Sequence, residues 1–188
     1  MTALVAGLAL FFAPHLLPVV PSLRTALVER AGDRGYRIAF SLVSAVGLLM
    51  IVFGYAYADK GTQLFAPVAA ARAIAPYAMV LAFILLASAH APSHLRAKVK
   101  HPMLIGILIW SAVHLLANGD VRGTVLFGAF LAYVLIDLAS VIGRGAVASF
   151  VPRARADVIS IVAGSVVALL VMTFHRILFG VGAVPFGV

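Results

Sequence analysis

The stretch PMLIGILIWSAVHLLANGDVRGTVLFGAFLAYVLIDLASV, residues 102–141, decides the fold class, because it holds two long apolar runs separated by one polar triplet. The runs, at 102–117 and 121–141, are continuously apolar, whereas the strands of a membrane barrel alternate apolar and polar residues. Each run approaches the ~20 residues that a helix needs to cross ~30 Å of hydrocarbon. The stretch therefore predicts two consecutive transmembrane helices.

The triplet Asn118-Gly119-Asp120 predicts how these two helices are joined. Gly119 can adopt the left-handed conformation that ends a helix, and Asp120 is a favourable N-cap for the next one. With almost no loop between them, the two helices are expected to form a tight antiparallel hairpin.

The rest of the chain continues the pattern. Of its 188 residues, 64% are hydrophobic and 11% are charged, with a mean hydropathy of +1.14, whereas soluble domains are about half apolar. Four further apolar runs lie at 1–20, 38–58, 74–91 and 158–179. The first lacks the basic start and cleavage site of a signal peptide, so we read it as a span. The fold class predicted is all-α, a polytopic integral membrane helix bundle with six transmembrane helices and a single domain, residues 1–188.

The basic residues predict the orientation of these helices. Of the 14 Lys and Arg residues, ten lie in the first, third and fifth connections. They are Arg24, Arg30, Arg34, Arg37, Arg96, Lys98, Lys100, Arg144, Arg153 and Arg155. Because cytoplasmic loops carry the excess of Lys and Arg, we expect a multi-pass protein of the bacterial inner membrane with both termini outside. The scattered basic residues form no stripe for nucleic acid, so we expect membrane lipid and no nucleic acid as a partner.

Histidines are the candidate ligands, because the chain has no cysteine and so no thiolate or covalent haem attachment. His15 and His114 lie inside apolar runs. Such a residue is either a neutral imidazole bonded to a backbone carbonyl or a metal ligand, and two of them with few acids nearby favour ligation. His101, beside Lys98 and Lys100, is a candidate for binding an anionic group.

A family resemblance supports the ligand interpretation. HPMLIGILIWSAVHLLANGDVRGTVLFG, residues 101–128, resembles the core of the NnrU family, in which Arg/Lys-His-Pro, Trp, His and Asn-Gly-Asp follow at this spacing. Residues 15–45 also resemble the first region of the family, with a histidine in the first span, Leu23-Arg24, and RGYRIAFSLVSA from residue 34.

The resemblance implies haem b (iron) as the cofactor. The plant zeta-carotene isomerase, a relative of the family, holds haem b between two histidines that correspond by motif to His15 and His114. A cysteine of that enzyme is Ser111 here, and another of its histidines has no counterpart near Ala56, so carotenoid isomerisation is an analogy. Bacterial members are associated with nitric-oxide and denitrification genes.

Three functions are therefore compatible with the sequence. One is a haem-dependent cis-trans isomerase or redox-linked protein acting on a lipophilic substrate or nitric oxide. Another is a non-catalytic sensor, or a membrane protein partner in respiratory complex assembly. The third is a membrane methyltransferase, because such enzymes share the His-Pro element, although this chain lacks their acidic pair.

The identity of the iron-ligating pair depends on depth in the membrane. His15 lies toward the cytoplasmic end of the first span and His114 toward the outer end of the fourth, about 12 Å apart in depth at 1.5 Å per residue. By depth alone, His175 is the better partner for His114. The expected metal ligands are His15 and His114, with His101 and His175 as further cofactor-binding candidates.

Overall fold

Helices account for all the regular elements in residues 1–184, the part of the chain that the computed structural model describes. They are α1 (Thr2–Leu16), the 3-10 turn η1 (Leu17–Val19), α2 (Pro21–Tyr57), α3 (Ala69–Ser88), α4 (His94–Val99), α5 (Pro102–Asn118), α6 (Val121–Gly143), α7 (Ala154–Thr173) and α8 (His175–Phe179).

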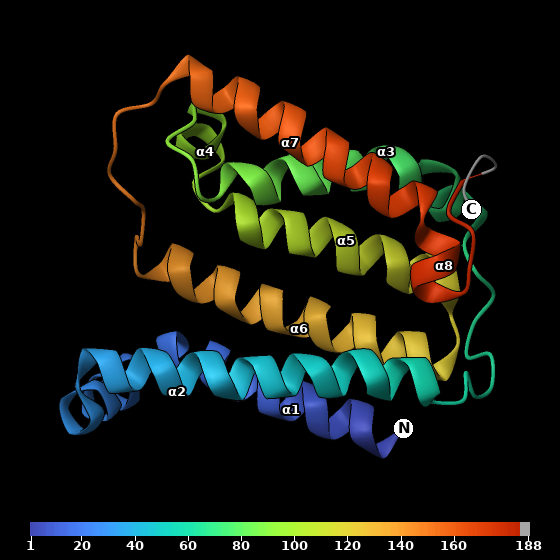
Figure 1. Cartoon of the computed structure of the whole chain (residues 1–188), viewed down its shortest axis with the longest axis horizontal. Coiled ribbons are helices and arrows are strands. Elements are labelled where there is room, and N and C mark those ends of the chain that lie inside the picture. Colours follow the sequence, from blue (N-terminus) through green and yellow to red (C-terminus); the bar gives the residue numbers. More distant parts are fainter. Residues whose placement is uncertain (185–188) are drawn as a thin grey trace.

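Six of these helices are the predicted spans. α1, α2, α3, α6 and α7 are long and apolar enough to cross a membrane, and the 17-residue α5 is apolar and only slightly shorter. Since α5 packs lengthwise between α3 and α6, it crosses the same membrane layer as these two helices (Figure 1). The prediction of a helical membrane bundle is confirmed.

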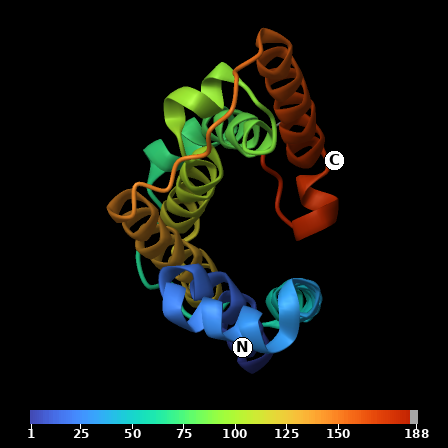
Figure 2. The same cartoon turned by 90° about the vertical axis from the view of Figure 1, so that its left-hand side faces the viewer.

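The spans form a curved single layer. Neighbours pack in the order α7, α3, α5, α6, α1, α2, and the view along the bundle shows them as an open arc (Figure 2). Within residues 1–184, no packing interface joins α2 to α7, so the arc has a concave face open on one side. Most large apolar side chains on the outer helices remain exposed, as expected where lipid is the solvent.

Glycines set the closest helix contacts. A Cβ on Gly54 of α2 would lie 2.5 Å from the backbone nitrogen of Leu4 on α1, and one on Gly164 of α7 would lie 2.5 Å from the Cα of Ile84 on α3. Gly164 and Ala168, one turn apart, are both buried, as their small-xxx-small spacing predicts. Gly128 on α6 stands in a similar motif with Ala132, but a Cβ on Gly128 would meet open space, so this motif makes no close helix contact.

One end of the bundle, the hairpin end, is closed by the turn between α5 and α6. Gly119 has φ 77° and ψ 0°, and the Asp120 carboxylate accepts a hydrogen bond from the Gly123 amide at 2.8 Å. The segment 59–68 crosses this turn, where the Leu64 amide donates to the Gly119 carbonyl at 2.8 Å. Arg122 donates to the carbonyls of Tyr55 and Ala58 at the end of α2. The predicted tight hairpin is confirmed.

The opposite end, the basic end, carries the connections from α1 to α2, from α3 through α4 to α5, and from α6 to α7 (Figure 1). The ten basic residues of these connections therefore gather at one end, as predicted. The first connection differs from the expected loop, because residues 21–31 are helical and are separated from the span by Gly32, with φ 69° and ψ 160°.

The last span is shorter than predicted. The run 158–179 was expected to be one helix, but α7 ends at Thr173 and the chain turns at Phe174 before α8 begins. His175 consequently lies at the start of α8, near the hairpin end, rather than within a continuous span.

Candidate functional site

A band of aromatic rings crosses α1, α6 and α5. Phe11 of α1 lies 5.9 Å from Phe130 of α6, measured between ring centroids, and Phe130 lies 5.2 Å from Trp110 of α5. Phe127, one turn before Phe130, also contacts Trp110 at 5.1 Å. The two intramembrane histidines lie at the two ends of this aromatic band.

His15 occupies the end of the band nearer the basic end. Its ring stacks on Phe11 at 4.2 Å and also contacts Phe40 of α2 at 5.0 Å and Tyr133 of α6 at 6.1 Å. Nδ1 lies 2.6 Å from the Phe11 carbonyl oxygen. Because a carbonyl oxygen can only accept, Nδ1 carries the proton, and in the neutral imidazole the lone pair is then on Nε2.

His114 occupies the other end in the same manner. Its Nδ1 donates to the Trp110 carbonyl oxygen at 2.8 Å, and its ring lies 5.5 Å from Trp110 and 4.9 Å from Phe127. Asn118 donates to the His114 carbonyl at 2.7 Å, which secures the last turn of α5. Here too the lone pair is on Nε2, the tautomer that a metal-ligating histidine uses.

The structure does not bring His15 and His114 into contact. The rings of Phe11, Phe130 and Trp110 lie in series between them. This separation agrees with the depth difference calculated from the sequence. These aromatic side chains connect the two histidines.

His175 lies at the same end of the bundle as His114. It begins α8, which lies at the hairpin end, where α5 also ends (Figure 1). The Nδ1 of His175 donates to the Val181 carbonyl oxygen at 2.6 Å, so this histidine also has its lone pair on Nε2. The turn at Phe174 is what brings α8, and with it His175, into this position.

His101, the fourth candidate, lies apart from the other three. It is the N-cap residue of α5, at the basic end, and its side chain makes no capping hydrogen bond. His114 lies near the opposite end of the same helix, so one cofactor would not contact both residues in this arrangement.

The donor atoms of these histidines show whether the site suits a haem. Neutral imidazoles with a free Nε2, set among aromatic and aliphatic side chains, match the ligands and surroundings that haem b requires. No cluster of three or more His, Asp or Glu side chains able to hold a bare metal ion occurs among the described residues. The donor set fits an iron porphyrin better than a bare metal ion.

A polar pair adjoins His15. The Tyr133 hydroxyl donates to the Asp137 carboxylate, four residues further along α6, at 3.3 Å. Arg144, two turns later, donates to the Ser140 carbonyl at 3.2 Å.

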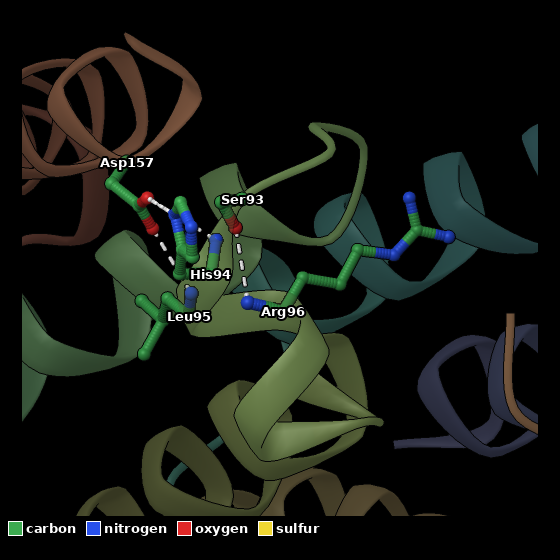
Figure 3. Close-up of polar contacts among 5 residues, drawn as sticks. All are labelled: Ser93, His94, Leu95, Arg96 and Asp157. Atoms are coloured by element: carbon green, nitrogen blue, oxygen red, sulfur yellow. Dashed lines mark hydrogen bonds and ion pairs between the residues drawn. The ribbon is translucent and has the colours of Figure 1, made fainter. Parts of the chain in front are cut away.

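Another set of polar contacts joins the start of α7 to the start of α4. Asp157 at the start of α7 accepts from the amides of His94 and Leu95 at the start of α4, at 3.2 and 2.9 Å, and contacts His94 Nδ1 at 2.7 Å (Figure 3). Ser93 caps the same helix by accepting from the Arg96 amide at 3.0 Å. These contacts fasten α7 to the basic end of the arc.

The comparisons with known proteins identify a family. No curated protein and no solved structure matches the chain. The model of the NnrU protein family matches residues 3–183, nearly the whole chain. The resemblance of residues 101–128 and 15–45 is thereby confirmed, and the protein belongs to the NnrU family.

Proposed function

We propose that this NnrU-family protein is a haem b protein of the bacterial inner membrane that acts on or with a lipophilic or nitric-oxide-related ligand. The observation that carries the proposal is the state of the intramembrane histidines. The Nδ1 atoms of His15, His114 and His175 each donate to a backbone carbonyl, which leaves Nε2 of each free to bind iron.

Bound haem b would supply a redox-active iron able to bind nitric oxide or exchange an electron with a lipophilic partner. The chain's own contribution is orientation and exclusion of water. The backbone carbonyls fix both imidazole planes, and the aromatic band supplies flat apolar surface that a porphyrin or another planar ligand can stack on. Such a ligand would enter from the bilayer through the open side of the arc.

His114 is the ligand shared by both possible pairs. The position of His175 at the hairpin end, where α5 also ends, supports these two as the iron ligands. The pair expected from sequence, His15 with His114, is the alternative, and it requires the rings of Phe11 and Phe130 to move.

Four alanine variants distinguish these pairs. In the full-length protein purified in mild detergent, His114→Ala should abolish low-spin haem, and His175→Ala should convert it to a high-spin form. His15→Ala should leave the spectrum unchanged if His175 is the second ligand. The matched control is His90→Ala, which removes an exposed imidazole that lies after the end of α3.

Imidazole in the buffer provides a second readout. If a variant has lost an iron ligand, added imidazole should restore the low-spin spectrum, whereas a misfolded variant should not respond. Loss of haem from His15→Ala alone, with rescue by imidazole, would reject His175 in favour of the pair expected from sequence.

A non-catalytic role is the second candidate. The open side of the arc, where α2 and α7 do not pack within residues 1–184, favours a membrane protein partner that completes the bundle. Copurification of an unrelated membrane protein with a haem-free chain would support this role over the first.

A further inference from the structure

The first connection contains a helix that does not run with the spans. Residues 21–31 form a helix that ends at Gly32, whose left-handed φ of 69° turns the chain into the rest of α2. In the view toward the basic end, this segment lies across the end of the bundle rather than along it (Figure 2). We refer to residues 21–31 as the interfacial helix.

The two sides of the interfacial helix differ in chemistry. At 100° per residue, Val20, Leu23 and Leu27 fall on one stripe, and Arg24 and Arg30 border that stripe on either side. The opposite side carries hydroxyl and acidic residues, namely Ser22, Thr25 and Glu29. A polar side, an apolar stripe and flanking arginines are the pattern of a helix lying in the plane of a membrane surface.

The apolar stripe is not covered by the protein itself. Val20 and Leu23 are each 48% exposed, although both are aliphatic. Because the helix lies across the end of a membrane-spanning bundle, lipid is the apolar phase available to cover them.

A shallow notch on the first turns after Gly32 adds positive charge. It is open to the surroundings and is lined by Asp33, Arg34, Arg37 and Ile38. Residues 33–57 would rise about 37 Å at 1.5 Å per residue, more than the ~30 Å of hydrocarbon. The first turns of this helix, with Arg34 and Arg37, therefore lie at the depth of the lipid headgroups.

We propose that the interfacial helix and this notch form a binding site for an anionic phospholipid. The Arg34 and Arg37 guanidiniums bind the headgroup phosphate through charge-assisted hydrogen bonds. The half-exposed Ile38 and Leu23 contact the upper acyl chain. Asp33 also lines the notch, where its carboxylate opposes anion binding, so the two arginines must outweigh it. This site is independent of the haem proposal.

The headgroup preference can be measured by native mass spectrometry of the full-length protein with equal amounts of phosphatidylglycerol and phosphatidylcholine. The parent protein should retain phosphatidylglycerol preferentially. The double variant Arg34→Gln/Arg37→Gln should lose roughly tenfold or more of that preference, since each basic group at an anionic surface contributes substantially to binding. Inorganic phosphate should not compete, because it lacks the acyl chain.

The matched control is Arg153→Gln/Arg155→Gln, which removes two charges at the same end but outside the notch. It should keep most of the preference. An equal loss in both double variants would overturn the proposal, because only net charge would then matter. The absence of any preference in the parent protein would overturn it as well.

The position of the interfacial helix can be tested separately, because the chain has no cysteine and accepts single labels directly. Spin labels at Leu23→Cys and Thr25→Cys, in vesicles of phosphatidylglycerol and phosphatidylcholine, should differ in accessibility. The label at 23 should be reached by oxygen from the lipid, and the label at 25 by a water-soluble nickel reagent. If both labels are reached equally from water, the helix does not lie in the membrane surface.

Discussion

Replacing Gly119 tests the closure of the hairpin end. Any other L-residue at φ 77° costs about 1–2 kcal/mol in backbone conformation. A Cβ there would also collide with the Phe65 carbonyl oxygen and lie 2.7 Å from the side-chain nitrogen of Gln63. The segment 59–68 must then move away from the turn.

That movement has its own cost. It breaks the hydrogen bonds from the Leu64 amide to Gly119 and from the Val121 amide to the Thr62 carbonyl, at 2.8 and 3.1 Å. At about 1 kcal/mol each, these bring the expected loss for Gly119→Val to about 3–4 kcal/mol. For a protein of this size, that corresponds to a fall of roughly 10 °C in melting temperature.

The assay is thermal unfolding in detergent, followed by size-exclusion fluorescence. Gly128→Ala is the matched control, because its Cβ meets open space and alanine favours the helix. Gly119→Asn separates the two causes, since asparagine tolerates positive φ but still carries the colliding Cβ. A Gly119→Asn protein as stable as the parent would refute the collision argument, and an unaffected Gly119→Val protein would refute the hairpin itself.

Three further predictions concern other parts of the fold. Reporter fusions should place the C-terminus outside and the connection between α3 and α5 in the cytoplasm, as the basic residues indicate, and the reverse pattern would show the orientation to be wrong. Gly164→Ala should lower the melting temperature although alanine has the better helix propensity, because the added Cβ would lie 2.5 Å from the Cα of Ile84 on α3. A variant more stable than the parent would contradict that packing. Asp157→Ala should loosen α7 and raise amide hydrogen exchange in α4 more than His94→Ala does. The reason is that the Asp157 carboxylate accepts hydrogen bonds from two backbone amides of α4. Equal exchange in the two variants would show that those amide bonds add nothing to stability.

Features set by local chemistry could be predicted from the sequence. The spans at 102–117 and 121–141 differ from α5 and α6 by no more than two residues at their ends. The Gly119 turn and the Asp120 cap follow from preferences that act within a few residues. The basic residues gather at one end because they lie in the first, third and fifth connections, and successive spans alternate in direction.

Features set by packing between distant segments could not be predicted. Whether a glycine such as Gly128 or Gly164 meets another helix depends on which face each helix presents, and most faces here are apolar. The helix break at Phe174 was not predicted, because no proline or glycine lies there, although the depth of His175 near His114 was expected. The arc-shaped order of the helices, which places the aromatic band between His15 and His114, also depends on contacts that no local pattern encodes.

Haem b held by intramembrane histidines can be verified by identifying the pigment of the purified protein. The full-length protein should be expressed with ample haem supply and purified in mild detergent. The account predicts a Soret band, sharp α and β bands on reduction, and haem that extracts completely into acidic organic solvent, since no cysteine can tether it. A well-folded protein that is colourless under these conditions would contradict the account.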